Sequence, residues 1–142
     1  GCGDSPAPLA PEPELPAELQ EFVSLLNAHR SSVGCEPLTW NPAVAAVAQA
    51  HSEDMVARSY FAHDNPDGQS PFDRLREAGV SFSGAAENIA YGYPGGAAVL
   101  NGWLNSTGHR ANIENCAFTH HGIGLEDGLW THLFVQNPLG AP

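Results

Sequence analysis

The chain has 142 residues, which is enough for one domain with a sizeable hydrophobic core. Sixteen acidic and five basic residues give it a net charge of −11. Such a surface repels nucleic-acid phosphates, so we expect no nucleic-acid partner. No apolar run in the sequence approaches the ~18–20 residues that span a bilayer.

The first residues predict a lipid anchor. Gly1 and Cys2 precede a stretch rich in Pro, Ala and Glu, as at the acylated cysteine of a bacterial lipoprotein. We therefore predict lipidation at Cys2, a disordered tether over residues 1–15, and a single domain over residues 16–142. The predicted location is outside the cell or on the cell envelope. The alternative is a cloning remnant followed by a disordered leader.

Without Cys2, the chain keeps Cys35 and Cys116. An even pair of cysteines in an exported protein is typical of a disulfide. Two buried free thiols are the alternative. The two are too far apart in sequence to resemble the close cysteine pairs of zinc sites.

Apolar residues at helical spacing predict helices over residues 16–33, 42–58, 71–78 and 97–106. Asn41 and Ser70 are suited to cap the second and third helices. Residues 80–96 are rich in Gly, Ser and Pro, so we expect them to be mostly irregular, with room for one strand. Asp127 and Gly128 predict a hairpin turn between strands 121–125 and 129–136. Helices first and strands late indicate an α+β layered sandwich.

Three short segments combine a functional side chain with small or aromatic neighbours. They are Tyr60-Phe61-Ala62-His63, Ala86-Glu87-Asn88-Ile89-Ala90 and Trp103-Leu104-Asn105-Ser106-Thr107-Gly108-His109-Arg110. An imidazole beside a carboxylate suits a divalent metal or a proton relay. It also suits a hydrogen-bonded polar knot that joins helices to the sheet.

With further short matches, these segments resemble the CAP superfamily of cysteine-rich secretory, antigen 5 and pathogenesis-related proteins. The resemblance is closest to bacterial SCP-like extracellular and lipoprotein members, and it covers residues 19–134. The other matching pieces are Leu26-Asn27 with Arg30, Cys35, Pro37-Leu38, Trp40-Asn41, Ala50-His51-Ser52, Asp54-Met55, Pro66-Asp67-Gly68, Asn112-Ile113 and Gly122-Ile123-Gly124. The resemblance implies a three-layer α/β/α sandwich with a mainly antiparallel central sheet and a central cleft.

In eukaryotic members that cleft carries two histidines and two glutamates, sometimes with a divalent metal. His63 matches the first histidine, and Glu87 matches the glutamate of the family's Gly-Glu-Asn segment. The second glutamate falls on Ser106 and the second histidine on Leu129. His132 comes three residues later, so strand alternation predicts that it points away from the cleft.

We therefore expect His63, Glu87, Ser106 and His109 to line the cleft. His63, Glu87 and His109 could together form an open zinc site, with two nitrogens and one oxygen. Ser106 and His109 could imitate a catalytic dyad, but no orienting acid can be assigned. A calcium loop starting at His63 is rejected, because its twelfth position is Arg74 instead of a glutamate.

The remaining histidines are expected to be structural or exposed. His51 lies on the apolar stripe of its helix and is predicted to be a hydrogen-bonded core residue. His120, His121 and His132 flank the hairpin, where solvated side chains are the simplest expectation.

Three functions remain open at this point. The first is a monomeric binding module whose aromatic-rich cleft holds a small apolar or peptide-like ligand. Its candidate aromatic residues are Tyr60, Phe61, Tyr91, Tyr93 and Trp103. The second is a metal-assisted hydrolase of peptide or envelope substrates. The third is a structural scaffold of the cell envelope without catalysis.

Overall fold

The structure is a computed structural model that describes residues 15–138. The predicted lipidation site at Cys2 and residues 1–14 of the predicted tether lie outside these residues. The described elements are α1 (Ala17–Ser32), β1 (Thr39–Trp40), α2 (Pro42–Ala57), α3 (Pro71–Glu77), β2 (Gly84–Tyr91), α4 (Gly96–Leu104), α5 (Thr107–Ile113), β3 (His120–Glu126) and β4 (Leu129–Gln136).

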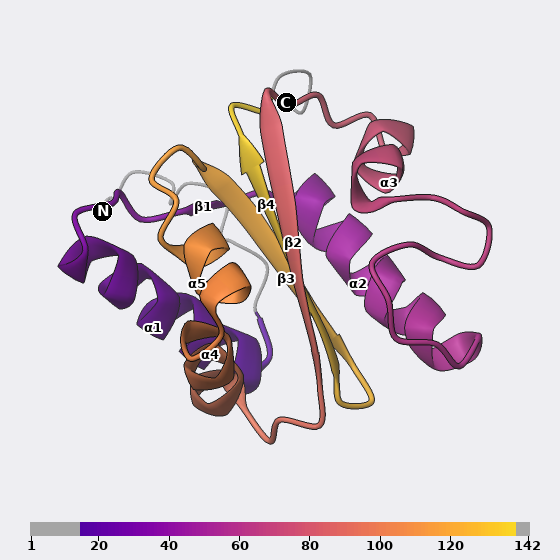
Figure 1. Ribbon diagram of the computed structural model, residues 1–142, viewed down its shortest axis with the longest axis horizontal. Helices are drawn as coiled ribbons and strands as arrows, with labels where there is room; N and C mark the ends of the chain where they lie inside the picture. Colours follow the sequence, from indigo (N-terminus) through magenta and orange to yellow (C-terminus); the bar gives the residue numbers. More distant parts are fainter. Residues whose placement is uncertain (1–14, 139–142) are drawn as a thin grey trace, which may run out of the picture.

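The elements form three layers around one sheet (Figure 1). Strands follow the order β1-β3-β4-β2, so β2 is an edge strand. Helices α1, α4 and α5 cover one face of the sheet, and α2 and α3 cover the other. The β3–β4 and β2–β4 pairs are antiparallel, and only the short β1–β3 pair is parallel. The predicted α/β/α sandwich with a mainly antiparallel sheet is confirmed.

Local signals set the helix starts. The Asn41 side chain accepts a hydrogen bond from the Val44 amide, with Pro42 in the first turn of α2. Ser70 and Asp73 form a reciprocal capping box at the start of α3. This box fixes the direction in which α3 leaves the preceding loop, and that direction matters for the site described below.

The predicted hairpin is present. Asp127 and Gly128 both have positive φ, of 46° and 79°, as a two-residue turn matched to strand twist requires. Helix α2 packs closely on the hairpin at Gly122 and Gly124. A Cβ atom at either position would overlap the α2 backbone, at Ala45 and Gln49 respectively. These glycines therefore let α2 approach the sheet at backbone contact distance.

Residues 80–96 contain the one strand that the sequence allowed for, and it takes up about half of them. Residues 84–91 form β2, an eight-residue strand paired with β4 from Gly84–Gln136 to Tyr91–Leu129. The bounds of β2 were not apparent in the sequence. A strand that is covered by helices on both faces does not need to alternate polar and apolar residues, and this strand consists largely of small residues. The sequence also missed α5 and the two-residue β1. His109 consequently lies within α5 and not just past a helix end.

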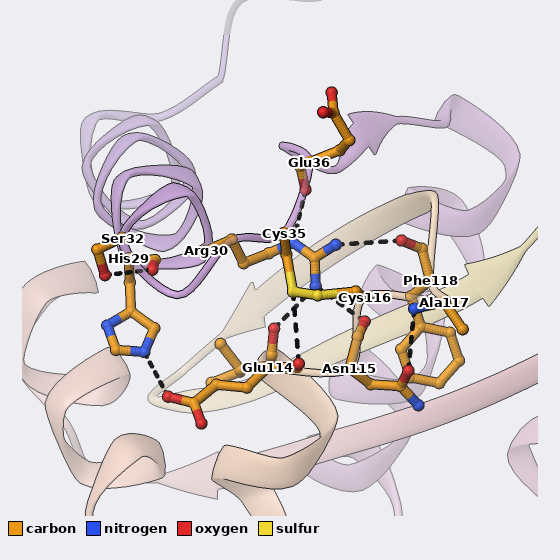
Figure 2. Close-up of a disulfide and its surroundings, with 11 residues drawn as sticks. His29, Arg30, Ser32, Cys35, Glu36, Glu114, Asn115, Cys116, Ala117 and Phe118 are labelled. Atoms are coloured by element: carbon orange, nitrogen blue, oxygen red, sulfur yellow. Dashed lines mark hydrogen bonds and ion pairs between the residues drawn. A yellow bond between two sulfur atoms is a disulfide. The ribbon is translucent and has the colours of Figure 1, made fainter.

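Cys35 and Cys116 form a disulfide between the loop after α1 and the segment after α5. Figure 2 shows Arg30 lying beside it. The Arg30 guanidinium is fully buried, and it donates hydrogen bonds to four carbonyl oxygens, those of Glu36, Ile113, Asn115 and Phe118. Arg30 and the disulfide thus join the same two parts of the chain.

Candidate binding cleft

A cavity of about 550 Å³ lies along the C-terminal end of edge strand β2, at residues 89–91. The loop segment Phe61–His63 forms one wall, and α4 and α5 form the other. Its lining includes the predicted residues His63, Ser106 and His109, together with the aromatic residues Phe61, Tyr91, Tyr93 and Trp103. We call this cavity the β2 cleft. The structure thus brings three of the four predicted cleft residues together around one cavity.

Aromatic side chains around the β2 cleft are unusually exposed. Phe61, Tyr91 and Tyr93 have exposed fractions of 54, 68 and 38%. Phe61 and Tyr91 also border a second cavity of about 400 Å³, lined by Tyr60, Leu129 and others. The two cavities share these aromatic walls, so they form neighbouring parts of one apolar surface. Exposed aromatic clusters of this kind are typical of binding surfaces.

Glu87 contacts His63 but does not line the β2 cleft. The Glu87 side chain is 1% exposed, and its Oε1 lies 2.8 Å from His63 Nδ1. Hydrogen bonding to Glu87 raises the pKa of His63, while burial and the charge of Arg74 oppose the rise. Because Nδ1 is engaged by Glu87, His63 has only Nε2 available for a ligand.

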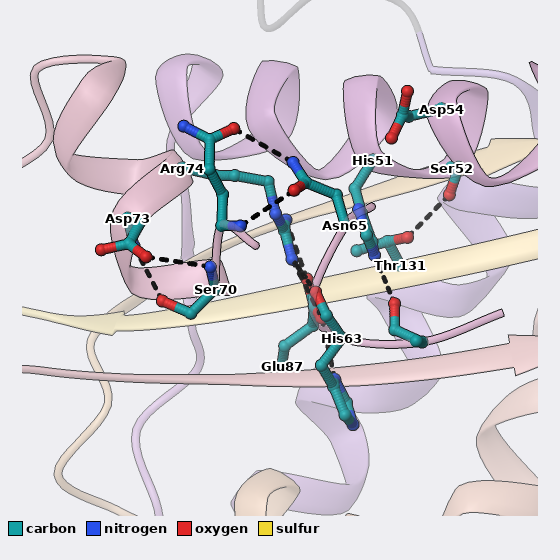
Figure 3. A network of polar contacts seen from close by, with 12 residues as sticks. His51, Ser52, Asp54, His63, Asn65, Ser70, Asp73, Arg74, Glu87 and Thr131 are labelled. Carbon is teal, nitrogen blue, oxygen red and sulfur yellow. Dashed lines mark hydrogen bonds and ion pairs between the residues drawn. The ribbon is translucent and has the colours of Figure 1, made fainter. Parts of the chain in front are cut away.

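A third residue, Arg74 of α3, completes this contact (Figure 3). Arg74 Nη1 and Nη2 each lie 3.2 Å from Glu87 Oε2, and Nη2 donates to the His63 carbonyl oxygen at 2.6 Å. The Arg74 side chain is 9% exposed. Arg74 binds the Glu87 carboxylate and the backbone carbonyl of His63 at the same time, so it links α3, β2 and the cleft wall.

Sequence reasoning did not identify Arg74 as a site residue. Arg74 was considered only as the residue that stands where a calcium loop would need a glutamate. A signal was present: the capping box at Ser70 and Asp73 fixes the first turn of α3 and places residue 74 next to it. Nothing local, however, shows that this turn faces Glu87, because that contact depends on β2, whose bounds and pairing the sequence did not predict.

On the opposite wall, His109 Nδ1 lies 2.9 Å from the Ser106 hydroxyl. Burial and the charge of His63 lower the pKa of His109. Ser106 is the residue that precedes the first turn of α5. No carboxylate among the described residues forms a hydrogen bond with His109. The pair therefore lacks the third group that orients a catalytic histidine.

The residues of the site do not fit a divalent metal. Among residues 15–138, no three His, Cys, Asp or Glu side chains are grouped so that they could share an ion. Both Glu87 oxygens are already bound by cationic or hydrogen-bonding partners. The expected combination of His63, Glu87 and His109 as three ligands is thus not formed, and we derive no chemistry through a metal.

The other histidines differ in how far their surroundings agree with the sequence predictions. His51 is buried, and its Nε2 lies 2.8 Å from the Ala62 carbonyl oxygen, which confirms the core prediction. His132 is not among the residues that line the β2 cleft, and it stacks on Trp103 in the core. The expectation that His121 and His132 are solvated is wrong. Both are fully buried, and His121 Nδ1 lies 2.9 Å from His132 Nε2.

Comparison with known proteins agrees with this architecture. Residues 23–137 match CAP, the Cysteine-rich secretory protein family. The chain is 42% identical over 118 residues to the Bacillus subtilis protein YkwD and 41% identical over 117 residues to the Bacillus subtilis membrane protein YlbC. These matches cover 82% of this chain but only 46% of YkwD and 34% of YlbC. The chain therefore spans less than half the length of either relative.

Solved structures show the same fold. A Bacillus anthracis extracellular protein containing a SCP domain has a TM-score of 0.80 and 42% identity, covering 83% of this chain and 40% of that one. An outer surface protein of Borrelia burgdorferi has a TM-score of 0.75 and 19% identity, covering 84% and 92%. At 19% identity, the second likeness bears on the fold alone. From the matched family, the sequence identities and the shared sandwich, this chain belongs to the CAP, or cysteine-rich secretory protein, family.

Proposed function

We propose that this chain is an extracytoplasmic CAP domain that acts as a binding module, with the β2 cleft as its ligand site. The ligand is a small apolar or peptide-like molecule. One observation carries the proposal: exposed aromatic side chains and the polar groups of His63, Ser106 and His109 meet in one cavity of about 550 Å³. An apolar lining with a few convergent polar groups is the usual make-up of a small-ligand site.

The location outside the cytoplasm has two supports. The Cys35–Cys116 disulfide suits an oxidising compartment. The Bacillus anthracis relative is described as extracellular. None of the described helices is long and apolar enough to cross a membrane. We further propose that acylation at Cys2 attaches the domain to the envelope, and that it acts as a monomer.

Binding is favoured over hydrolysis by the arrangement of the polar groups. The Ser106–His109 pair has no orienting carboxylate among the described residues, and Glu87 is paired with Arg74. The cleft thus has hydrogen-bonding groups for a ligand, and its one hydroxyl–imidazole pair has no carboxylate that would orient the histidine for catalysis. The scaffold function is the outcome if no ligand binds.

Native mass spectrometry of the protein purified from its own envelope tests this proposal. We expect a non-covalent adduct on the wild type, and an intact mass that includes acyl groups on Cys2. Ala62→Trp places an indole at the mouth of the β2 cleft, so it should weaken binding at least about tenfold, or about 1.4 kcal/mol.

Ala117→Trp is the matched control, because Ala117 is exposed and lies outside the β2 cleft. It should retain the adduct. An adduct that survives Ala62→Trp, or titrations with decanoate and with short apolar peptides that are all flat, would remove the support for a binding module.

A further inference from the structure

The position beside Glu87 is occupied by a cation that belongs to the chain itself. Arg74 Nη2 lies 3.2 Å from Glu87 Oε2 and 3.4 Å from Oε1, and Nη1 lies 3.2 Å from Oε2. With His63 Nδ1 on Oε1, the carboxylate has hydrogen-bond donors on both oxygens. Paired guanidinium and carboxylate groups form strong, directional contacts.

Arg74 is held in this position independently of Glu87. The capping box of α3 fixes its backbone, and Nη2 also bonds the His63 carbonyl oxygen. Its buried Nε has no hydrogen-bond partner within residues 15–138. A buried N–H without a partner is destabilising, so the contacts of the two terminal nitrogens must offset that cost.

We propose that the Arg74 guanidinium takes the place of a divalent cation at Glu87, so that the β2 cleft works without a metal ion. The guanidinium neutralises the buried Glu87 carboxylate and bonds both this carboxylate and the His63 carbonyl oxygen. A metal ion at Glu87 would otherwise supply that positive charge. Arg74 is thus a positioning residue that also determines ion selectivity. This inference concerns the cation and does not depend on which ligand the cleft binds.

Electrostatics explain why Arg74 would exclude a metal. A divalent ion at Glu87 would have to lie within a few ångströms of a fixed positive charge. In the low dielectric of a site this buried, like charges that are this close repel much more strongly than they do in water. The ion would also have to displace hydrogen bonds from both oxygens of a carboxylate that is 1% exposed.

Calorimetric titration with Zn²⁺ of the full chain tests this inference. Four proteins are compared: wild type, Glu87→Gln, Arg74→Met, and the double variant Arg74→Met with Glu87→Gln. Surface histidines that bind zinc contribute equally to all four, so only differences that depend on Glu87 count. We expect wild type and Glu87→Gln to give the same isotherm. Arg74→Met should gain Zn²⁺ affinity at least about tenfold over the double variant.

Thermal unfolding gives a second readout and guards against a folding defect. Zn²⁺ should raise the Tm of Arg74→Met and leave that of the wild type unchanged. If Arg74→Met does not fold, Arg74→Gln replaces it, because its amide can still bond the His63 carbonyl oxygen. Zinc binding by the wild type that is lost in Glu87→Gln would overturn the inference. So would a folded Arg74 variant that gains no Glu87-dependent site.

The two proposals fail separately. A ligand that binds the wild type only when Zn²⁺ is present would refute the metal-free cleft while the binding function stands. A domain that binds no ligand but gains zinc in Arg74→Met would refute the binding function alone.

Discussion

Arg30 is a buried side chain that joins the two segments linked by the disulfide. Its guanidinium is fully buried beside the disulfide and bonds four carbonyl oxygens, and burial lowers its pKa. These bonds close the loop after α1 onto the segment between α5 and β3. One side chain thereby replaces the regular backbone pairing that these irregular segments lack.

Arg30→Met should lower the free energy of unfolding by about 3–5 kcal/mol, because four carbonyl groups, two of them in fully buried contacts, lose a charged donor. Urea denaturation measures the loss. Arg76→Met is the control. Arg76 is 64% exposed and pairs with Asp73 at 3.7 Å, so its loss should cost under about 1 kcal/mol. Equal losses in the two variants would contradict this role of Arg30.

At the scale of elements, the contact between α2 and the hairpin is set by glycine. A methyl group at Gly122 would overlap the backbone of Ala45, so α2 would have to move away from β3. That movement would also separate the buried residues Val44 and Leu133, which share one core cluster.

We expect Gly122→Ala to destabilise the fold by about 1–3 kcal/mol or more, because the overlap is with backbone and not with a flexible side chain. Thermal and urea denaturation give the value. Gly108→Ala is the matched control, since a Cβ atom there would meet no atom of another segment within 4 Å and the residue is within α5. It should be neutral or stabilising by up to about 1 kcal/mol. A stable Gly122→Ala would mean that α2 can pack on the hairpin without this close approach.

Elements with strong local signals were predictable, and elements defined by their partners were not. Asn41, the Ser70 capping box and the Asp127-Gly128 turn act within a few residues, and each appears where the sequence predicted it. Strand β2 has no such signal, because its small residues are accommodated by layers contributed from distant segments. The Arg74–Glu87 contact depends on β2, so it was missed for the same reason.

At the scale of the whole molecule, stability should depend on pH through the buried His121–His132 pair. Burial, with smaller contributions from neighbouring charges, lowers the pKa of His121 to about 3 and that of His132 well below 6.5. Both are therefore neutral in the folded protein, and they bind protons on unfolding below pH 6.5. The ring nitrogens His121 Nε2 and His132 Nδ1 form no hydrogen bond with any of residues 15–138. A proton added to either ring in the folded protein would therefore have no acceptor to stabilise it.

The free energy of unfolding should therefore be fully retained above about pH 6.5 and fall as the pH drops toward 3. Each histidine contributes a slope of about 1.4 kcal/mol per pH unit. Burial also lowers the pKa values of His51 and His109 from 6.5, so these two histidines add to the loss of stability in the same pH range. His63, with its raised pKa, loses its stabilising contribution as pH rises through that pKa. Asp54 and Asp73, with lowered pKa values, lose theirs at more acidic pH.

Urea titrations at about pH 7, 6 and 5 measure this slope. His132→Gln removes one of the two buried groups, so its slope should be shallower than that of the wild type. A wild-type stability that is flat between about pH 7 and 5 would contradict the neutral buried pair.

The central claim is that the β2 cleft holds a ligand between His63 and His109. The most direct measurement is NMR of the imidazole ¹⁵N signals during titration with decanoate and with short apolar peptides. Saturable shifts of His63 and His109, with His120 unchanged as the internal reference outside the cleft, are the predicted result. Signals of His63 and His109 that stay fixed, or that move only together with His120, would contradict the account.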